Sequence, residues 1–233
     1  MTEHAQQVLP GSAVGDGTAP ARPSTLRKVQ QIFDAARTVF LEFGYDASSM
    51  EVIAKRAGVS KATVYAHFTN KEDLFEAMIR QECQGIADGI YQPDANSEDL
   101  AGELRKMARN VTALFAGGDG LAVYRILVPV APRFPRLGEV FYAEGPLSGR
   151  ENFAEFLRLA HQRGRLKIPN PTLAAEQFMS LIRGDLALDA MLLVAPRPQE
   201  EVEALIEGGI AVFLNAYRAD PAPQSTGGPQ PPH

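Results

Sequence analysis

The segment 49–71, SMEVIAKRAGVSKATVYAHFTNK, has the spacing of two short helices joined by a tight turn. Ala54 is small enough to let a second helix pack closely against the first. Gly58 follows four residues later, where the chain must adopt a left-handed conformation that glycine takes without steric cost. Val64 then points back into the angle between the helices, and Ser60 is placed to cap the second helix. This spacing predicts a helix-turn-helix.

The second helix, expected over 61–68, has two outward faces, because residues three or four apart in a helix share a face. One face carries Lys61, Ala62 and Tyr65, and the next carries Thr63 and His67. A short, capped helix with hydrogen-bond donors on its outer side is suited to the major groove of DNA. An ordinary helical hairpin with a capped turn is the alternative, but it does not explain these donors.

The motif GVSKATVYAHFTNKEDLF, at 58–75, resembles the signature of the TetR family of bacterial one-component transcriptional regulators. Upstream, FLEFGYDASSMEVIAKRA at 40–57 resembles the end of helix one and the second helix of that family. Two later motifs, VAPRFPRLGEVFY and LAAEQFMSLIRG, resemble the C-terminal domain of the AefR-like branch. The positions that match the head pattern are Gly44, Tyr45, Ile53, Ala54, Ala57, Gly58, Val59, Ser60, Thr63, Tyr65, Phe68, Lys71 and Leu74.

The resemblance implies roles for residues on the two faces. Lys61, Ala62 and Tyr65 match positions that face the bases, where lysine can donate to guanine and alanine can contact a thymine methyl. The matching phosphate-facing positions, which set register, are Ser49, Thr63, His67 and Lys71. Three alternatives that involve no DNA contact remain open: Tyr65 only packs, His67 is a neutral surface residue, and Thr63 bonds back within its helix.

Net charge is −5, but its distribution matters more than the total for a DNA-binding protein. Residues 26–80 contain eight basic and seven acidic side chains, a net charge of +1, so the remainder carries −6. A nearly neutral DNA-binding segment on an acidic body is compatible with specific binding and predicts weak non-specific binding.

Helical periodicity continues along the chain and no strand pattern interrupts it, so the expected fold is all-α. The first helix is expected over 24–43, ended by Gly44, with Ser48 and Glu51 forming a capping box for the next. Asn70 caps a helix over 71–89. Further helices are expected from 97 to the Gly117-Gly118 pair and over 121–130, 137–143, 148–163, 171–194 and 199–218.

We divide the chain into four parts. Residues 1–23 and 220–233 are rich in Pro and Gly without periodicity and are predicted to be a disordered N-terminal arm and C-terminal tail. Residues 24–71 form a three-helix DNA-binding head with the helix-turn-helix. Residues 72–219 form a larger helical body for ligand binding and dimerisation.

The body is expected to hold an effector pocket and a dimer interface. The predicted pocket residues are Tyr124, Phe141, Tyr142, Phe153 and Arg183, which are aromatic or charged interruptions of apolar runs. The predicted interface residues lie in the last two helices and are Gly184, Leu205, Gly209 and Phe213. For both sets the alternative is ordinary monomer core.

Other classes of protein lack support in the sequence. The single cysteine, Cys83, excludes an intrachain disulfide and suits a reducing cytoplasm; packing and redox sensing are its two alternatives. No Cys/His cluster predicts a metal, no motif predicts a cofactor, and no apolar run reaches a membrane span. No nucleophile–base pair or phosphate loop indicates an enzyme.

The resemblance therefore predicts a cytoplasmic homodimer that binds a palindromic double-stranded operator as a repressor. A small apolar or amphipathic effector would release it. A transcriptional activator of the same fold is one alternative. A helical protein-interaction module is another, and it would lack the steep salt dependence of DNA binding.

Overall fold

The computed structural model describes residues 23–116 and 121–219, so the predicted arm (apart from Pro23) and tail lie outside the described residues. Within these ranges all regular structure is helical, and one isolated antiparallel bridge joins Leu166 to Arg218. This confirms the all-α prediction. No helix in the described part of the chain is long and apolar enough to cross a membrane.

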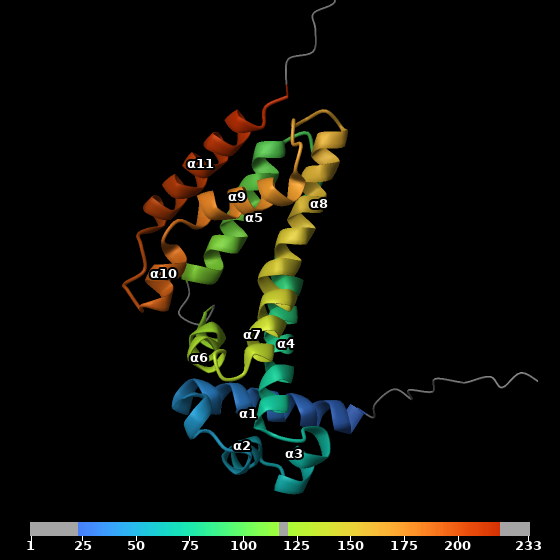
Figure 1. Ribbon diagram of the computed structural model, residues 1–233, viewed down its shortest axis with the longest axis vertical. Helices are drawn as coiled ribbons and strands as arrows, with labels where there is room; N and C mark the ends of the chain where they lie inside the picture. The colour runs from blue at the N-terminus through green and yellow to red at the C-terminus, as the bar shows by residue number, and fades with distance from the viewer. Residues whose placement is uncertain (1–22, 117–120, 220–233) are drawn as a thin grey trace, which may run out of the picture.

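The helices form an elongated molecule with the head at one end (Figure 1). The helices α4 and α8 run along the long axis, whereas α9 and α11 gather at the far end from the head. The elements are α1 (Pro23–Ala47), α2 (Met50–Ala57), α3 (Lys61–His67), α4 (Lys71–Gly89), α5 (Leu100–Ala116), α6 (Ala122–Val130), α7 (Pro135–Tyr142), the π-helix η1 (Ala143–Leu147), α8 (Ser148–Gln162), α9 (Pro171–Arg183), α10 (Leu186–Met191) and α11 (Gln199–Ala216).

Two glycines shape the head as the sequence predicts. Gly44 leaves the helical conformation with φ 75°, which ends the regular part of α1. Gly58 follows α2 with φ 67°, and the next residue, Val59, donates its N–H to the Ala54 carbonyl at 3.1 Å. A side chain at either glycine would be strained in this left-handed conformation.

The predicted capping box at Ser48 and Glu51 is wrong. The N-cap of α2 is Ser49, whose Oγ accepts the Val52 N–H at 3.3 Å. Ser48 is buried, and its hydroxyl donates back to the carbonyl of Gly44. The α2 helix thus begins one residue later than predicted, because the turn directs Ser48 inward.

Helix boundaries at a proline and a glycine of the body differ from the prediction. Pro146 does not end a helix, because α7 continues through η1 into α8. The wider π turn accommodates a residue that has no N–H to donate. In contrast, the helix expected over 171–194 divides at Gly184, where φ is 46° and ψ is −133°, into α9 and α10.

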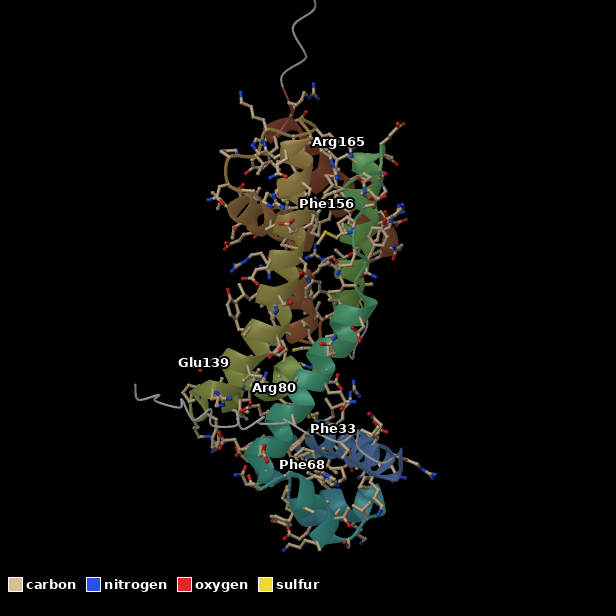
Figure 2. All side chains as sticks on the ribbon, turned by 90° about the vertical axis from the view of Figure 1, so that its right-hand side faces the viewer. Phe33, Phe68, Arg80, Glu139, Phe156 and Arg165 are labelled. Carbon is tan, nitrogen blue, oxygen red and sulfur yellow. The ribbon has the colours of Figure 1, made fainter. Side chains whose placement is uncertain are left out.

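Two apolar cores lie one above the other along the molecule. The lower core joins α1–α4 with α6 and α7, and the upper core joins α5, α8, α9 and α11. Figure 2 shows Phe33 and Phe68, whose ring centroids lie 5.5 Å apart in the head. The lower core therefore crosses the boundary predicted between residues 71 and 72.

A buried carboxylate, that of Glu103, stabilises the segment that connects α4 to α5. Glu103 is only 3% exposed and accepts hydrogen bonds from the Tyr91 hydroxyl, the Asp94 N–H at 2.8 Å and the Lys106 ammonium at 3.0 Å. These bonds, chiefly the one from Tyr91, lower the pKa of Glu103 from 4.5 to about 2. The sequence pattern did not predict this site.

Replacing Glu103 with Gln should remove a pH-dependent part of the stability. Because the folded-state pKa is lowered, the stabilisation by Glu103 is present above pH about 4.5 and is lost as the pH falls towards about 2. Urea unfolding across this range should give a wild-type advantage that shrinks with acidification. Glu200→Gln, at an exposed glutamate of α11, is the control. A difference between wild type and Glu103→Gln that stays constant with pH would contradict the assignment.

Candidate nucleic-acid interface

The α3 helix presents a short, capped surface at the outer end of the head (Figure 1). Ser60 caps it by accepting the Thr63 N–H at 3.0 Å, and Val64 is fully buried against the head core. These contacts fix the rotation of the helix. The predicted base-facing residues Lys61, Ala62 and Tyr65 are consequently all exposed.

Lys61 is held in place by two neighbours. Its ammonium forms an ion pair with Glu51 of α2 and lies 5.5 Å from the centroid of the Tyr65 ring. The hydrogen bond to Glu51 raises the pKa of Lys61, and the same bond lowers the pKa of Glu51. The sequence predicted a capping box for Glu51 rather than this ion pair, because pairing between α2 and α3 depends on the angle between them.

The predicted phosphate-facing residues lie at the edges of this surface. Ser49 and Thr63 are half-buried, and each takes part in a cap: Ser49 starts α2, and the Thr63 hydroxyl lies 2.8 Å from that of Ser60. His67 is half-buried at the end of α3 beside Phe68, with 6.3 Å between ring centroids. Their contact with phosphate stays a prediction.

Lys71 points inward, unlike the phosphate contact predicted for it. Its ammonium donates to the carbonyls of Tyr45 at 2.6 Å, Ser48 at 3.0 Å and Asp46 at 3.3 Å, and lies 4.4 Å from the Tyr45 ring centroid. An ammonium has three donors, so these carbonyls use them all. Burial lowers the pKa of Lys71. The structure gives this residue the role of tying the start of α4 to the turn between α1 and α2.

The five predicted pocket residues do not converge on one cavity. Tyr124 and Phe141 stack at 5.4 Å, whereas Phe153 is buried in the upper core against Phe156 and Phe178. Tyr142 and Arg183 are exposed. Phe153 is therefore a core residue, as the alternative reading has it. An effector contact by Tyr124, Phe141, Tyr142 or Arg183 stays a prediction.

The four predicted dimer residues pack within a single chain. Phe213 is 1% exposed against Phe178, and a Cβ on Gly209 would lie 3.3 Å from Leu181 of α9. A Cβ on Gly184 would similarly lie 3.3 Å from the Leu205 side chain. Gly209 and Phe213 are buried and let α9 and α11 approach each other, so the monomer-core alternative describes them. Gly184 is exposed and Leu205 is half-buried, so their place in a dimer interface stays a prediction.

Cys83 is buried, and this burial raises the pKa of its thiol to about 11. A thiol with a raised pKa is seldom ionised at neutral pH. Because the thiolate is the reactive form, such a thiol is a poor redox sensor. Of the two alternatives for Cys83, the structure favours packing over redox sensing.

Comparison with known proteins decides the family. Residues 32–78 match the family profile described as "Bacterial regulatory proteins, tetR family". Residues 102–219 match the profile of the "AefR-like transcriptional repressor, C-terminal domain". The chain belongs to the TetR family. The two profiles cover the head and most of the body of this TetR-family regulator, and they bear out both resemblances seen in the sequence.

Similar proteins cover nearly the whole described chain. The solved structure of the flavonoid-responsive regulator FrrA is 38% identical with a TM-score of 0.76, covering 84% of this chain and 99% of that one. A putative TetR-family regulator from Mesorhizobium loti is 29% identical with a TM-score of 0.78, covering 84% and 100%. The uncharacterised regulator YvkB of Bacillus subtilis is 26% identical over 82% of this chain and 97% of its own length. This TetR-family chain is therefore a DNA-binding transcriptional regulator.

Replacing Lys71 with Met should destabilise the protein as well as weaken its DNA binding. The loss of charge-assisted bonds to three carbonyls should cost about 2 kcal/mol, because a bond to a charged group contributes about 1.5–3 kcal/mol. Urea unfolding without DNA measures this cost. Lys55→Met, at an exposed lysine of α2, is the control and should leave the unfolding free energy unchanged. A Lys71→Met variant as stable as wild type would return Lys71 to the phosphate-facing set.

Proposed function

We propose that the protein is a sequence-specific repressor that binds a palindromic operator as a homodimer and is released by a small-molecule effector. The observation that carries the proposal is the exposed outer face of α3, with Lys61, Ala62 and Tyr65 on a capped helix. The family profile that matches the body is described as that of a transcriptional repressor, which favours repression over activation. Such a regulator acts in the cytoplasm, where bacterial DNA lies.

Base recognition would come from the outer face of α3. Lys61 can donate to guanine acceptors in the major groove, and the Ala62 methyl can contact thymine. Tyr65 is 43% exposed, so its ring extends beyond the surface of the helix. Because Glu51 already holds the Lys61 ammonium, this lysine enters the groove from a defined position.

Phosphate contacts would set the register of α3 on the DNA. Ser49 and Thr63 lie at the first turns of α2 and α3, where backbone N–H groups also favour anions. His67, at the end of α3, is the third predicted contact. These residues flank the base-facing set on the same end of the molecule.

A dimer interface would use apolar surface that the monomer leaves uncovered. Large apolar side chains are exposed on α10, after it and on the outer side of α11. They are Leu188, Leu192, Leu193, Val194 and Val212, with exposures of 52–71%. Exposed apolar surface of this kind indicates a binding surface. A two-fold dimer here would place two heads for a palindrome, with half-sites about one helical turn or a multiple apart.

Release by an effector follows from coupling between body and head. An effector that favours an arrangement unsuited to the operator must lower DNA affinity, and operator DNA must lower effector affinity by the same factor. The shared lower core supplies a mechanical connection, since α6 and α7 of the body pack directly on the head.

Replacing Tyr65 with Ala should weaken operator binding by about tenfold, in line with about 1–3 kcal/mol for a specific base contact. The measurement is fluorescence anisotropy with DNA from the region upstream of the protein's own gene, in a series of salt concentrations. Wild-type affinity should fall steeply with salt because phosphate contacts release counterions.

Tyr142→Ala is the matched control, because Tyr142 is an exposed tyrosine of α7 away from α3. It should bind the operator as wild type does. Equal losses in the two variants, or affinity that does not respond to salt, would contradict this assignment of the DNA-binding face and favour a protein-interaction module.

A further inference from the structure

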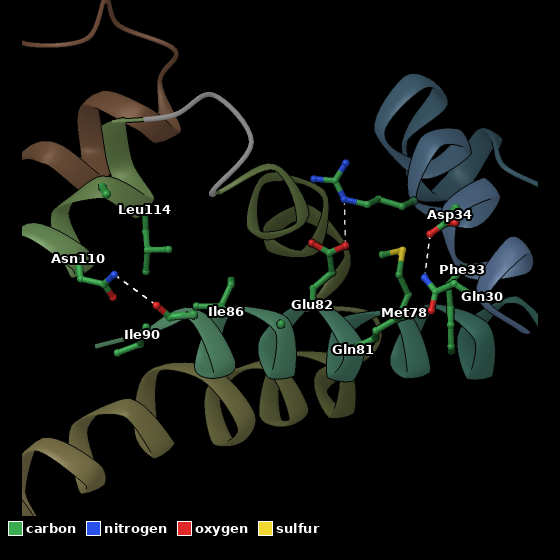
Figure 3. A pocket seen from close by; sticks show the side chains of 14 residues that line it. Gln30, Phe33, Asp34, Met78, Gln81, Glu82, Ile86, Ile90, Asn110 and Leu114 are labelled. Carbon is green, nitrogen blue, oxygen red and sulfur yellow. Dashed lines mark hydrogen bonds and ion pairs between the residues drawn. The ribbon is translucent and has the colours of Figure 1, made fainter. Parts of the chain in front are cut away.

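A cleft of about 560 Å³ opens between the head and the body, on one side of α4 (Figure 3). Its floor is a stripe of α4 from Met78 to Gly89, continued by Ile90. One wall is α1 and the other is α5. This volume lies in the range of small-molecule sites, about 300–1,000 Å³. None of the five pocket residues predicted from the sequence lines it.

Two glycines one turn apart leave the floor of the cleft open. Gly85 and Gly89 are exposed on the same face of α4, and a Cβ on either would meet no atom within 4 Å. Glycine within a helix is destabilising relative to alanine. No neighbouring helix approaches these positions closely enough to require it, so the packing of the chain does not account for them.

The remaining floor and walls offer apolar surface. Met78 and the half-buried Ile86 come from α4, and the half-buried Ile90 directly follows that helix. Leu114 comes from α5 and Phe33 from α1. Figure 3 shows these side chains along the cleft. A ligand that lies along this floor would need an apolar body.

The charged lining favours a cation. Asp34, Glu82 and Arg37 are the charged residues that line the cleft, so its formal charge is −1. Arg37 Nε donates to one oxygen of Glu82 at 2.9 Å, and Gln30 donates to one oxygen of Asp34 at 2.9 Å. An ionised carboxylate accepts about four hydrogen bonds, so both groups retain capacity for a ligand.

We propose that this cleft binds a small organic cation with an apolar body. The apolar part lies over Gly85 and Gly89, and the positive group lies near Glu82 and Asp34. Because α1 belongs to the head and α5 to the body, the occupant contacts both. Its regulatory consequence rests on the proposed function: such a ligand is the effector that releases the operator.

The test uses two probes of the same shape and opposite charge, tetraphenylphosphonium and tetraphenylborate. Isothermal titration calorimetry measures the binding of each to the full chain without DNA. Wild type should bind the cation about tenfold or more tightly than the anion, as expected for an interaction with a carboxylate. Glu82→Gln should reduce this preference, because it removes one negative charge and frees Arg37.

Gly85→Leu tests the location of the site. The leucine side chain enters open space and improves helix propensity, so this variant should fold at least as well as wild type. It should lose tetraphenylphosphonium binding. Gly149→Leu is the matched control, since a Cβ on Gly149 in α8 also meets no atom within 4 Å, and Gly149 does not line the cleft. It should bind as wild type does.

Three results would overturn the proposal: no binding of the cation, equal or tighter binding of the anion, or undiminished cation binding by Gly85→Leu. Operator anisotropy with and without tetraphenylphosphonium then tests the regulatory step separately. Cation binding that Gly85→Leu abolishes, with operator affinity unchanged at saturation, would establish the site and contradict release of DNA by this ligand class.

Discussion

Four aromatic rings hold the DNA-binding head against the body. Phe40 of α1, Tyr45 after Gly44, and Phe75 of α4 contact one another at centroid distances of 4.8–5.9 Å. Phe134, just before α7, adds a ring 5.5 Å from Tyr45. Burying such rings removes a large apolar area from water. The orientation of α1 relative to α4 and α7 depends on this cluster.

The proposed DNA-binding face of α3 depends on the same region through polar contacts. Lys71, at the start of α4, donates to carbonyls around Tyr45 and so fixes the turn that leads into α2. From there the caps Ser49 and Ser60 set the starts of α2 and α3. A shift of α4 would therefore reach the outer face of α3 through a short series of contacts.

The sequence predicted local structure well and contacts between distant segments poorly. Gly44, Gly58, Ser60 and Asn70 act as predicted, because caps and left-handed turns depend on neighbours within a few residues. Phe213 and Gly209 were misassigned, because a helical stripe shows that a face is covered without showing what covers it. The hydrogen bonds of Lys71 were missed for a similar reason: its three carbonyl partners lie 23–26 positions away in the sequence.

The proposed reading of DNA sequence by α3 of a two-fold dimer is tested most directly by selection of bound fragments from genomic DNA with the purified full chain. We expect enrichment of an inverted repeat whose half-sites are spaced by about one helical turn or a multiple of it. An enriched single half-site would contradict the dimer, and the absence of any enriched sequence would contradict sequence-specific binding by α3.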